Sequence, residues 1–499
     1  MRYLLVFFAG VCSLAADPVR FRITLNPAIA PKGVSGRLFV FLDKGDTPLD
    51  RIKVGFLPKS VWFAAKEIPF WNPGETIELN PDEHAFPQPI SKAEKGDYVV
   101  MALLDPDHSF ASHRQDTGDL ASPVAVLKDF VPSNAAPVSL ELSSLTPAPA
   151  AKKDTANIKY VEYQSPLLSA FWGRAITMRA GVVVPTEHTG ESLPLPAVYH
   201  IHGFGGNYKE AWAKGERLAE AMASGENLKA VHVFLDANCP GGHHVFADSV
   251  NNGPWGQALT VELIPHLETR FRLAPTASGR FLTGHSSGGW SALWLQVRYP
   301  DFFGGSWPTS PDATDFRSFT GIDVTPESNQ NAYRKKDGGS LNLVRMNGKE
   351  IMSMEEFARM ESITGEVGGQ LASFEWTFSP RGPDGRPMPL FNRATGALSD
   401  EVRVYWQRYD IARVVRDNWK TLGPKLRGKI RLVIGADDNF HLNESADLLC
   451  GWLREKGRED ACEIVPGRDH FDLHRPFDTY PKGLYQRIDD EMRAQWEKR

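Results

Sequence analysis

The residues with the clearest chemical meaning lie in the stretch Phe281–Trp290, which reads FLTGHSSGGW. It places Ser286 between Gly284 and Gly288, directly after an apolar run that is typical of a strand. The pattern Gly-x-Ser-x-Gly is that of the nucleophile elbow, a sharp strand-to-helix turn that exposes a serine hydroxyl at the edge of a sheet. Glycines flank such a turn because side chains would clash there. By itself the motif also fits an ordinary glycine-rich turn, so the rest of the chain has to supply partners for the serine.

Those partners are a base and a carboxylate. A serine hydroxyl becomes a good nucleophile only when a base removes its proton, and a carboxylate holds that base in place. In the fold that carries the elbow, the acid and the histidine follow the serine in that order, each after a later strand. One predicted strand is followed by Asp437 and Asp438, and the next by His470. We therefore expect Ser286, one of the two aspartates and His470 to form a catalytic triad.

Acyl transfer also needs main-chain N–H donors for the oxyanion of the tetrahedral intermediate. The stretch Tyr199–Asn207, YHIHGFGGN, reads as a strand that ends in a glycine-rich loop. The amide of Phe204 in this loop can face the elbow, and the amide of Ser287 follows the nucleophile directly. We predict that Phe204 and Ser287 form the oxyanion hole. This chemistry requires no cofactor.

These elements lie in a region where strands and helices alternate, which predicts an α/β fold with a mainly parallel sheet covered by helices. The apolar repeat from Trp255 to Phe271 predicts an amphipathic helix, and Trp290–Arg298 predicts the helix that leaves the elbow. Between about 312 and 403 the alternation stops, and only Met354–Met360 looks helical. We interpret that segment as an insertion over the active-site face. The predicted strands lie at 197–201, 230–235, 280–283, 430–434 and 462–465.

The N-terminal part of the chain has a different pattern. In residues 17–145, apolar and polar residues alternate, as in Phe21, Ile23 and Leu25, and turn residues separate the runs, which predicts a β-sandwich-like domain. The Pro/Ala-rich residues 146–156 predict a linker. The catalytic domain then spans residues 157–499.

Residues 1–16 have the features of a signal peptide: a positive charge at Arg2, a short apolar run and a small-x-small cleavage site. We therefore expect a secreted or periplasmic protein with no stable membrane insertion after signal removal, because no later segment reaches the ~18 apolar residues of a spanning helix. Charged residues make up 23% of the chain, and its net charge of −5 is small for 499 residues, so no nucleic-acid partner is expected. In an oxidising compartment a Cys450–Cys462 disulfide would leave Cys239 over, and three buried thiols are the alternative.

Together these stretches resemble the putative-esterase (esterase D-like) family of α/β-hydrolases, which includes feruloyl esterases, enterochelin esterases and antigen 85-type acyltransferases. The resemblance implies Ser286 as nucleophile and His470 as base. It implies Asp438 as the acid, because the Asp-x-Phe pattern of the family matches Asp438–Phe440, although Gly435-x-Asp437 also occurs in hydrolases. The insertion near 312–403 is long for the family, so the substrate cannot be carried over. The stretches that carry the resemblance are Tyr199–Gly206, Asn252–Gly256, Glu262–Pro265, Gly284–Gly289, Arg298–Phe303, Asp438–Phe440 and Pro466–His470.

Several weaker signals have two interpretations each. The loop Gly241–His244, together with Asp248, has residue types that could form a metal site. Adjacent histidines in a glycine loop rarely converge on one ion, so we expect no metal there. We assign His243 to the lining of the substrate pocket instead. Trp255 and Trp290 flank the site in the sequence and could stack on an aryl or sugar group, with core packing as the alternative. We expect His285 to be a packing residue rather than a second base.

The sequence therefore predicts an exported serine ester hydrolase that forms an acyl-enzyme, with a small-molecule or carbohydrate ester, such as an aryl ester, as substrate. Serine peptidase and acyltransferase activities use the same fold and are the nearest competing functions. A polysaccharide-binding protein with an inert hydrolase domain is the competing function outside the enzymes. Composition and motifs say nothing about the oligomeric state.

Overall fold

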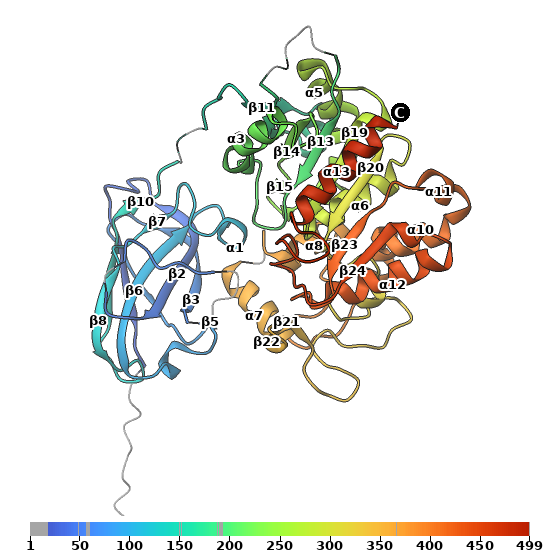
Figure 1. Ribbon diagram of the computed structural model, residues 1–499. Helices are drawn as coiled ribbons and strands as arrows, with labels where there is room; N and C mark the ends of the chain where they lie inside the picture. Colours follow the sequence, from blue (N-terminus) through green and yellow to red (C-terminus); the bar gives the residue numbers. More distant parts are fainter. Residues whose placement is uncertain are drawn as a thin grey trace, which may run out of the picture. The chain divides into compact units, whose positions relative to one another are not determined.

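The structure is a computed structural model that describes residues 18–47, 49–55, 60–148, 150, 152–186, 188, 193–365 and 367–498 (Figure 1). The predicted signal peptide over residues 1–16 lies outside these ranges. The described chain divides into two compact units, the first formed by residues 18–110 and 114–148, and the second by residues 111–113 and those from 150 onward. No helix in the described ranges is long and apolar enough to cross a membrane.

The first unit consists of two β-sheets that share one apolar core. One sheet has the order β4-β1-β9, and the other the order β10-β7-β6-β2-β3-β5, with β8 paired to β6. Alternate residues of β1 and β2 are buried in the same cluster, so the two sheets pack face to face. The strands are β1 (Phe21–Leu25), β2 (Val34–Lys44), β3 (Trp62–Trp71), β4 (Thr76–Leu79), β5 (Ala85–Phe86), β6 (Gly96–Asp105), β7 (Leu120–Ala121), β8 (Ala125–Phe130), β9 (Val138–Leu142) and β10 (Ser144–Leu145).

The second unit contains an eight-stranded sheet of order β11-β12-β14-β13-β19-β20-β23-β24. β12 is antiparallel to both of its neighbours, and every pair from β14 to β24 is parallel. With helices between the parallel strands, this is the α/β-hydrolase fold predicted from the sequence. The strands are β11 (Ile158–Gln164), β12 (Thr177–Val183), β13 (Ala197–Ile201), β14 (Val231–Leu235), β19 (Arg280–His285), β20 (Gly305–Thr309), β23 (Leu432–Gly435) and β24 (Cys462–Val465).

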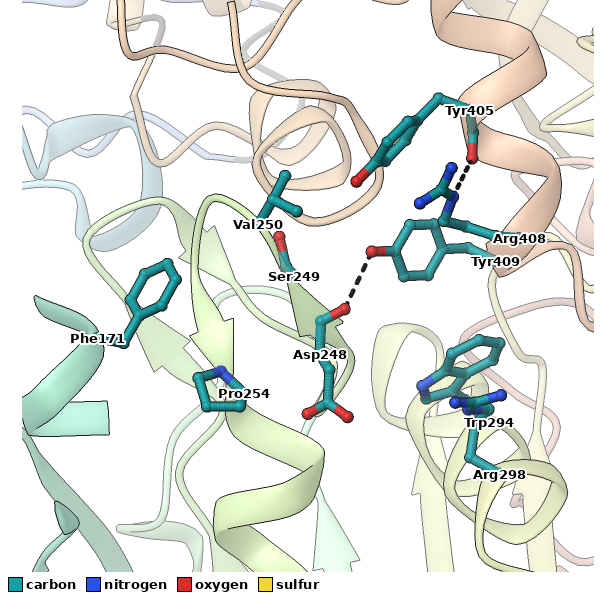
Figure 2. A pocket seen from close by; sticks show the side chains of 10 residues that line it. All are labelled: Phe171, Asp248, Ser249, Val250, Pro254, Trp294, Arg298, Tyr405, Arg408 and Tyr409. Carbon is teal, nitrogen blue, oxygen red and sulfur yellow. Dashed lines mark hydrogen bonds between the residues drawn. The ribbon is translucent and has the colours of Figure 1, made fainter. Parts of the chain in front are cut away.

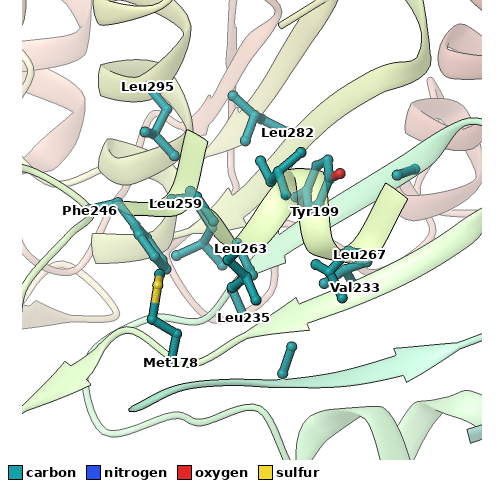
Figure 3. Packing of buried hydrophobic residues seen from close by; sticks show 14 of the residues in the cluster. Met178, Tyr199, Val233, Leu235, Phe246, Leu259, Leu263, Leu267, Leu282 and Leu295 are labelled. Carbon is teal, nitrogen blue, oxygen red and sulfur yellow. The ribbon is translucent and has the colours of Figure 1, made fainter. Parts of the chain in front are cut away.

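Side chains of the parallel strands alternate between two apolar layers, one on each face of the sheet. Tyr199 and Leu282 lie in the layer that contains α4, α5 and α6 (Figure 3), whereas Val198 and Phe281 lie in the layer that contains α13. Because both faces are covered, these strands are rich in apolar residues, although His200, His232 and Thr283 also lie in them. The helices are α2 (Pro166–Trp172), α3 (Glu210–Ala223), α4 (Trp255–Ala258), a π-helical turn (Leu259–Leu263), α5 (Ile264–Phe271), α6 (Ser287–Arg298), α12 (Leu442–Glu455) and α13 (Leu484–Glu497).

The segment between β20 and β23 includes the predicted insertion at about 312–403, and the expectation of a single helix in that insertion was wrong. Its helices have seven to eleven residues, too few for a clear apolar period, and α8 is buried on nearly all sides. The segment contains β21 (Asn342–Met346), β22 (Lys349–Ser353), α7 (Met354–Thr364), α8 (Gln370–Phe378), α9 (Asp400–Trp406), α10 (Ile411–Asp417) and α11 (Trp419–Lys425).

Candidate active site

Ser286 occupies the predicted sharp turn between β19 and α6. Its backbone angles, φ 59° and ψ −126°, lie in a region that L-residues rarely adopt. The Ser286 N–H donates to the carbonyl oxygen of Thr309 in β20 at 3.1 Å. A Cβ on Gly284 would lie 2.3 Å from the carbonyl oxygen of Gly288, and one on Gly288 would lie 2.0 Å from that of Ile201. The surrounding main chain thus requires both glycines and holds the serine in its strained conformation.

A buried carboxylate–imidazole pair lies at the ends of the last two strands. Nδ1 of His470 is 2.8 Å from Oδ2 of Asp438, and the two side chains are 4% and 0% exposed. The other oxygen of Asp438 accepts hydrogen bonds from the N–H groups of Phe440 (2.9 Å) and Leu442 (3.4 Å) at the start of α12. Asp437 is exposed. The structure therefore brings Asp438, and not Asp437, to His470.

The loops that carry this pair are tied together by Asn439 and by Arg345, which lies in β21 of the insertion. Oδ1 of Asn439 accepts from the N–H of His470 at 3.0 Å, and its Nδ2 donates to the carbonyl oxygen of Arg345 at 2.8 Å. The Arg345 guanidinium donates to the carbonyl oxygens of Asp438 (2.9 Å) and Ala436 (3.2 Å). Sequence reasoning missed Arg345, since nothing in the pattern of its neighbours links it to a loop more than 90 residues later.

Of the two predicted oxyanion donors, Ser287 follows the nucleophile directly, and Phe204 belongs to a loop that passes close to it. The loop after β13 passes close to Ser286, because a Cβ on Gly203 would be 3.3 Å from Ser286 Cβ and 3.9 Å from its Oγ. Phe204 is the next residue in that loop. Ser287 is the first residue of α6, where main-chain N–H groups have no partner within the helix and favour negative charge.

Asp312 is a buried carboxylate beside the elbow that the sequence analysis did not single out. Its Oδ2 accepts from Oγ of Ser287 at 2.6 Å, and its N–H donates to the carbonyl oxygen of Ser286 at 3.2 Å. Burial raises the pKa of Asp312 to about 6, while the hydroxyls of Ser287 and Ser286 and the charge of His470 act in the opposite direction. No motif surrounds Asp312, and only the path of β20 beside β19 brings it here.

The three residues predicted to bind substrate are buried, so a direct contact with substrate is not supported. His243, Trp255 and Trp290 are 2%, 4% and 1% exposed. Burial also lowers the pKa of His243 to about 3, so its imidazole is neutral. These rings pack the interior because each polar atom finds an internal partner. Each donates a ring N–H to a main-chain carbonyl oxygen: His243 to His202, Trp255 to Asn252 and Trp290 to Ala313.

His243, His244 and Asp248 are the residues that the sequence analysis weighed as a metal site. His244 stacks on Trp255 with ring centroids 3.8 Å apart, whereas Asp248 is exposed on the hairpin of β17 (Asp248–Ser249) and β18 (Gly253–Pro254). Within the described ranges, no group of three or more His, Cys, Asp or Glu residues could hold a metal ion.

Asp248 instead borders a surface cavity of about 550 Å³ (Figure 2). Trp294 and Arg298 of α6 lie ~12 and ~18 Å along the helix axis from Ser286, at the 1.5 Å rise per residue of an α-helix. The cavity is thus separate from the nucleophile. It is lined by Phe171, Asp248, Ser249, Val250, Pro254, Trp294, Arg298, Tyr405, Arg408 and Tyr409.

Comparison with known proteins finds one family model that matches part of the chain. Residues 169–361 match the model of a family described as "Putative esterase". No curated protein matches the sequence with significance. Similar solved structures include a ferulic acid esterase (16% identity, 68% of this chain and 99% of that chain, TM-score 0.41). A second is the fluorophosphonate-binding serine hydrolase F of Staphylococcus aureus (14% identity, 68% of this chain and 98% of that chain, TM-score 0.38). A third is an S-formylglutathione hydrolase from Agrobacterium tumefaciens (16% identity, 70% of this chain and 98% of that chain, TM-score 0.38). These likenesses are weak, and the fold is established by the strand order of the sheet itself.

Proposed function

We propose that this chain is a carboxylic ester hydrolase that works through an acyl-enzyme on Ser286, with His470 as base and Asp438 as acid. Its residues 169–361 match the model of the putative-esterase family. The observation that carries this proposal is the buried 2.8 Å contact between His470 Nδ1 and Asp438 Oδ2. It leaves Nε2 as the ring nitrogen available to the serine. A carboxylate on Nδ1 fixes the tautomer in which Nε2 can accept a proton.

Acylation follows from these roles. Oγ of Ser286 attacks the ester carbonyl carbon while its proton moves to Nε2 of His470, and Asp438 stabilises the imidazolium that forms. The negative charge on the carbonyl oxygen is held by the main-chain N–H groups of Phe204 and Ser287. When the tetrahedral intermediate collapses, the bond to the alcohol oxygen breaks, and that oxygen takes the proton from Nε2. The products of this half-reaction are the free alcohol and the acyl-enzyme.

Deacylation repeats the sequence with water. His470 takes a proton from the water, whose oxygen bonds to the acyl carbon, and the bond to Ser286 Oγ then breaks. The proton on Nε2 returns to Oγ, so the enzyme is restored and the carboxylic acid leaves. No redox change occurs, and no step calls for a cofactor.

The experiment that tests this function compares the wild type with Ser286→Ala on a p-nitrophenyl ester. We expect the variant to lose on the order of 10⁴–10⁶ in turnover with its melting temperature unchanged, as in other triad enzymes. Full turnover in the variant would place the nucleophile elsewhere. The same wild type should cleave esters far faster than matched peptide anilides; the reverse preference would make it a peptidase.

An acyltransferase and a glycan-binding protein would each give a different result with the purified wild type. Transfer of the acyl group to an added sugar or alcohol in preference to water would make the protein an acyltransferase. A polysaccharide-binding protein with an inert hydrolase unit would bind glycans and turn over no ester at all.

We further propose the biological setting expected from the sequence. The substrate would be an acylated carbohydrate or an aryl ester, residues 1–16 would direct export, and residues 17–145 would form a separate β-domain joined through the linker 146–156. A panel of feruloyl, acetyl-sugar and siderophore esters would rank the substrates, and N-terminal sequencing of the mature protein would show whether residues 1–16 are removed.

A further inference from the structure

The proposed triad leaves one buried carboxylate beside Ser286 without a role. Asp312 is 5% exposed, and its Oδ2 accepts a 2.6 Å hydrogen bond from the side chain of Ser287. That bond uses the hydroxyl of Ser287 and not its main-chain N–H, so the predicted oxyanion donor is still available. A buried carboxylate is costly unless it is paired or hydrogen-bonded, and here the elbow supplies the hydrogen bond.

The backbone fixes Asp312 against the elbow. It lies three residues after β20, whose neighbour β19 leads into Ser286. The Asp312 N–H donates to the carbonyl oxygen of Ser286 at 3.2 Å. A Cβ on Gly289 in the first turn of α6 would lie 3.1 Å from Cα of Pro311, so the loop and the helix are in close contact. The main chain at Asp312 is therefore held beside the nucleophile, and the hydrogen bond to Ser287 orients the carboxylate.

The charged groups around Asp312 come from two other loops. His470 follows β24 and lowers the pKa of Asp312, whereas Asp438 follows β23 and raises it. At the elbow, the hydroxyls of Ser287 and Ser286 also lower the pKa of Asp312. Burial outweighs these effects, so the pKa of Asp312 is about 6 and the group is ionised at neutral and alkaline pH.

We propose that ionised Asp312 is a positioning residue of this centre, which holds the side chain of Ser287 and places a second negative charge beside the imidazolium of His470. This inference rests on the proposed function. When His470 accepts the serine proton, its positive charge forms in a site with little water, where a nearby negative charge has a large effect. Asp438 supplies one such charge through direct contact, and Asp312 supplies the other from the side of the elbow.

Two variants separate the charge from the hydrogen bond. Asp312→Asn keeps an acceptor for Ser287 but removes the charge, whereas Ser287→Ala removes the hydrogen bond and keeps the carboxylate. We expect Asp312→Asn to lower kcat roughly ten- to a hundred-fold, less than the ~10²–10³ of a lost oxyanion-hole donor, because the charge of Asp312 acts on His470 and not on the substrate. Ser287→Ala should cost only a few-fold at pH 8.

The pH profile gives a readout that a merely structural role would not change. In the wild type, protonation of His470 removes activity and protonation of Asp312 lowers it ten- to a hundred-fold, so log(kcat/KM) should fall with a slope between one and two over roughly one to two pH units near pH 6 and with a slope of about one below them. In Asp312→Asn the slope should be about one along the whole acid limb, because the base His470 is then the one group of the pair that must be unprotonated. Ser287→Ala should keep the wild-type slope.

Asp410→Asn is the matched control. Asp410 is also buried with a pKa of about 6, but it accepts from the N–H groups of Phe316 and Arg413 and belongs to no part of the proposed site. Its variant should keep the wild-type acid limb. An unchanged slope in Asp312→Asn, or an equal loss of kcat in Ser287→Ala, would overturn the inference while the triad stands. Failure of the proposed function itself shows separately, as full turnover in Ser286→Ala.

Discussion

The guanidinium of Arg345 donates a 2.9 Å hydrogen bond to the main-chain carbonyl oxygen of Asp438, the residue that holds His470. The main-chain N–H of Arg345 donates to the carbonyl oxygen of Asn439 at 2.9 Å, and the side chain of Asn439 in turn accepts from the N–H of His470. The insertion therefore supports the two loops that carry the acid and the histidine. The sequence predicts only a cover over the active-site face, because nothing local links the insertion to those loops.

Arg345→Ala should lower both activity and stability. The variant removes the guanidinium donor of the carbonyl oxygens of Asp438 and Ala436, although Asp438 keeps a 3.3 Å hydrogen bond from the N–H of His441. Lost hydrogen bonds of this kind cost ~1–3 kcal/mol in unfolding free energy. We expect kcat to fall about ten-fold or more, because small displacements of an active-site group are costly. Arg334→Ala, which removes an exposed ion pair to Glu355 in the same insertion, should change neither quantity appreciably. Equal effects of the two variants would show that the support is not specific.

The choice between the two adjacent aspartates can be tested directly. Asp438→Asn should keep the shape of the acid but lose the charge that fixes the tautomer of His470, which costs up to ~10⁴ in kcat in comparable triads. Asp437→Asn should change kcat no more than a few-fold, because Asp437 is exposed. Steady-state kinetics on one small ester suffices. A crippled Asp437→Asn beside a nearly normal Asp438→Asn would shift the acid by one residue.

The ionised carboxylate of Asp312 should lower the unfolding free energy of the protein at alkaline pH. Its pKa rises from an ordinary 3.8 to about 6 in the folded protein. Between these values the folded state binds more protons than the unfolded state, so the unfolding free energy falls as pH rises and the loss is complete above pH 6. A shift of this size corresponds to at most ~3 kcal/mol. Asp312→Asn should therefore melt higher than the wild type at pH 8 but not at pH 4. Exposed Asp437→Asn is the control, and a gain of equal size at both pH values would contradict this account.

The disulfide between Cys450 and Cys462 joins α12, which follows the acid, to β24, which leads toward the histidine. It closes a loop with a sequence separation of 12. Replacing both cysteines by Ala should lower the unfolding free energy by ~2–4 kcal/mol, the usual effect of such a bridge. Thermal denaturation followed by circular dichroism measures this change. Cys239→Ala provides the comparison, since Cys239 is the free cysteine of the described chain. Identical melting curves would show that the bridge adds nothing.

Much of the hydrolase unit could be predicted because its strands and its elbow follow local rules. The parallel strands are mostly apolar, and the glycines around Ser286 are required by contacts within a few ångströms. The order of serine, acid and histidine along the chain then follows from the fold. These features depend on short stretches of sequence, so one sequence is enough to find them.

The remaining features depend on contacts between distant segments, which no local pattern records. Asp312 reaches the site because β20 runs beside β19, and Arg345 reaches it because the insertion folds back onto the loops after β23 and β24. Burial of the predicted pocket residues has a related cause: Trp290 is next to the elbow in sequence, but the helical turn points it into the core, where its ring N–H donates to the carbonyl oxygen of Ala313. Closeness in sequence to a nucleophile does not show which way a side chain points.

The most direct test of the central claim is the site of covalent modification by a fluorophosphonate, a reagent that reacts with activated serines. We predict a single adduct on Ser286, mapped by peptide mass spectrometry, which forms rapidly in the wild type and is nearly abolished in His470→Ala, because the hydroxyl is activated only by its base. Ser287 is the internal control, one residue away and bonded to Asp312. An adduct on any other serine, or labelling of Ser286 at the same rate in His470→Ala, would contradict the account.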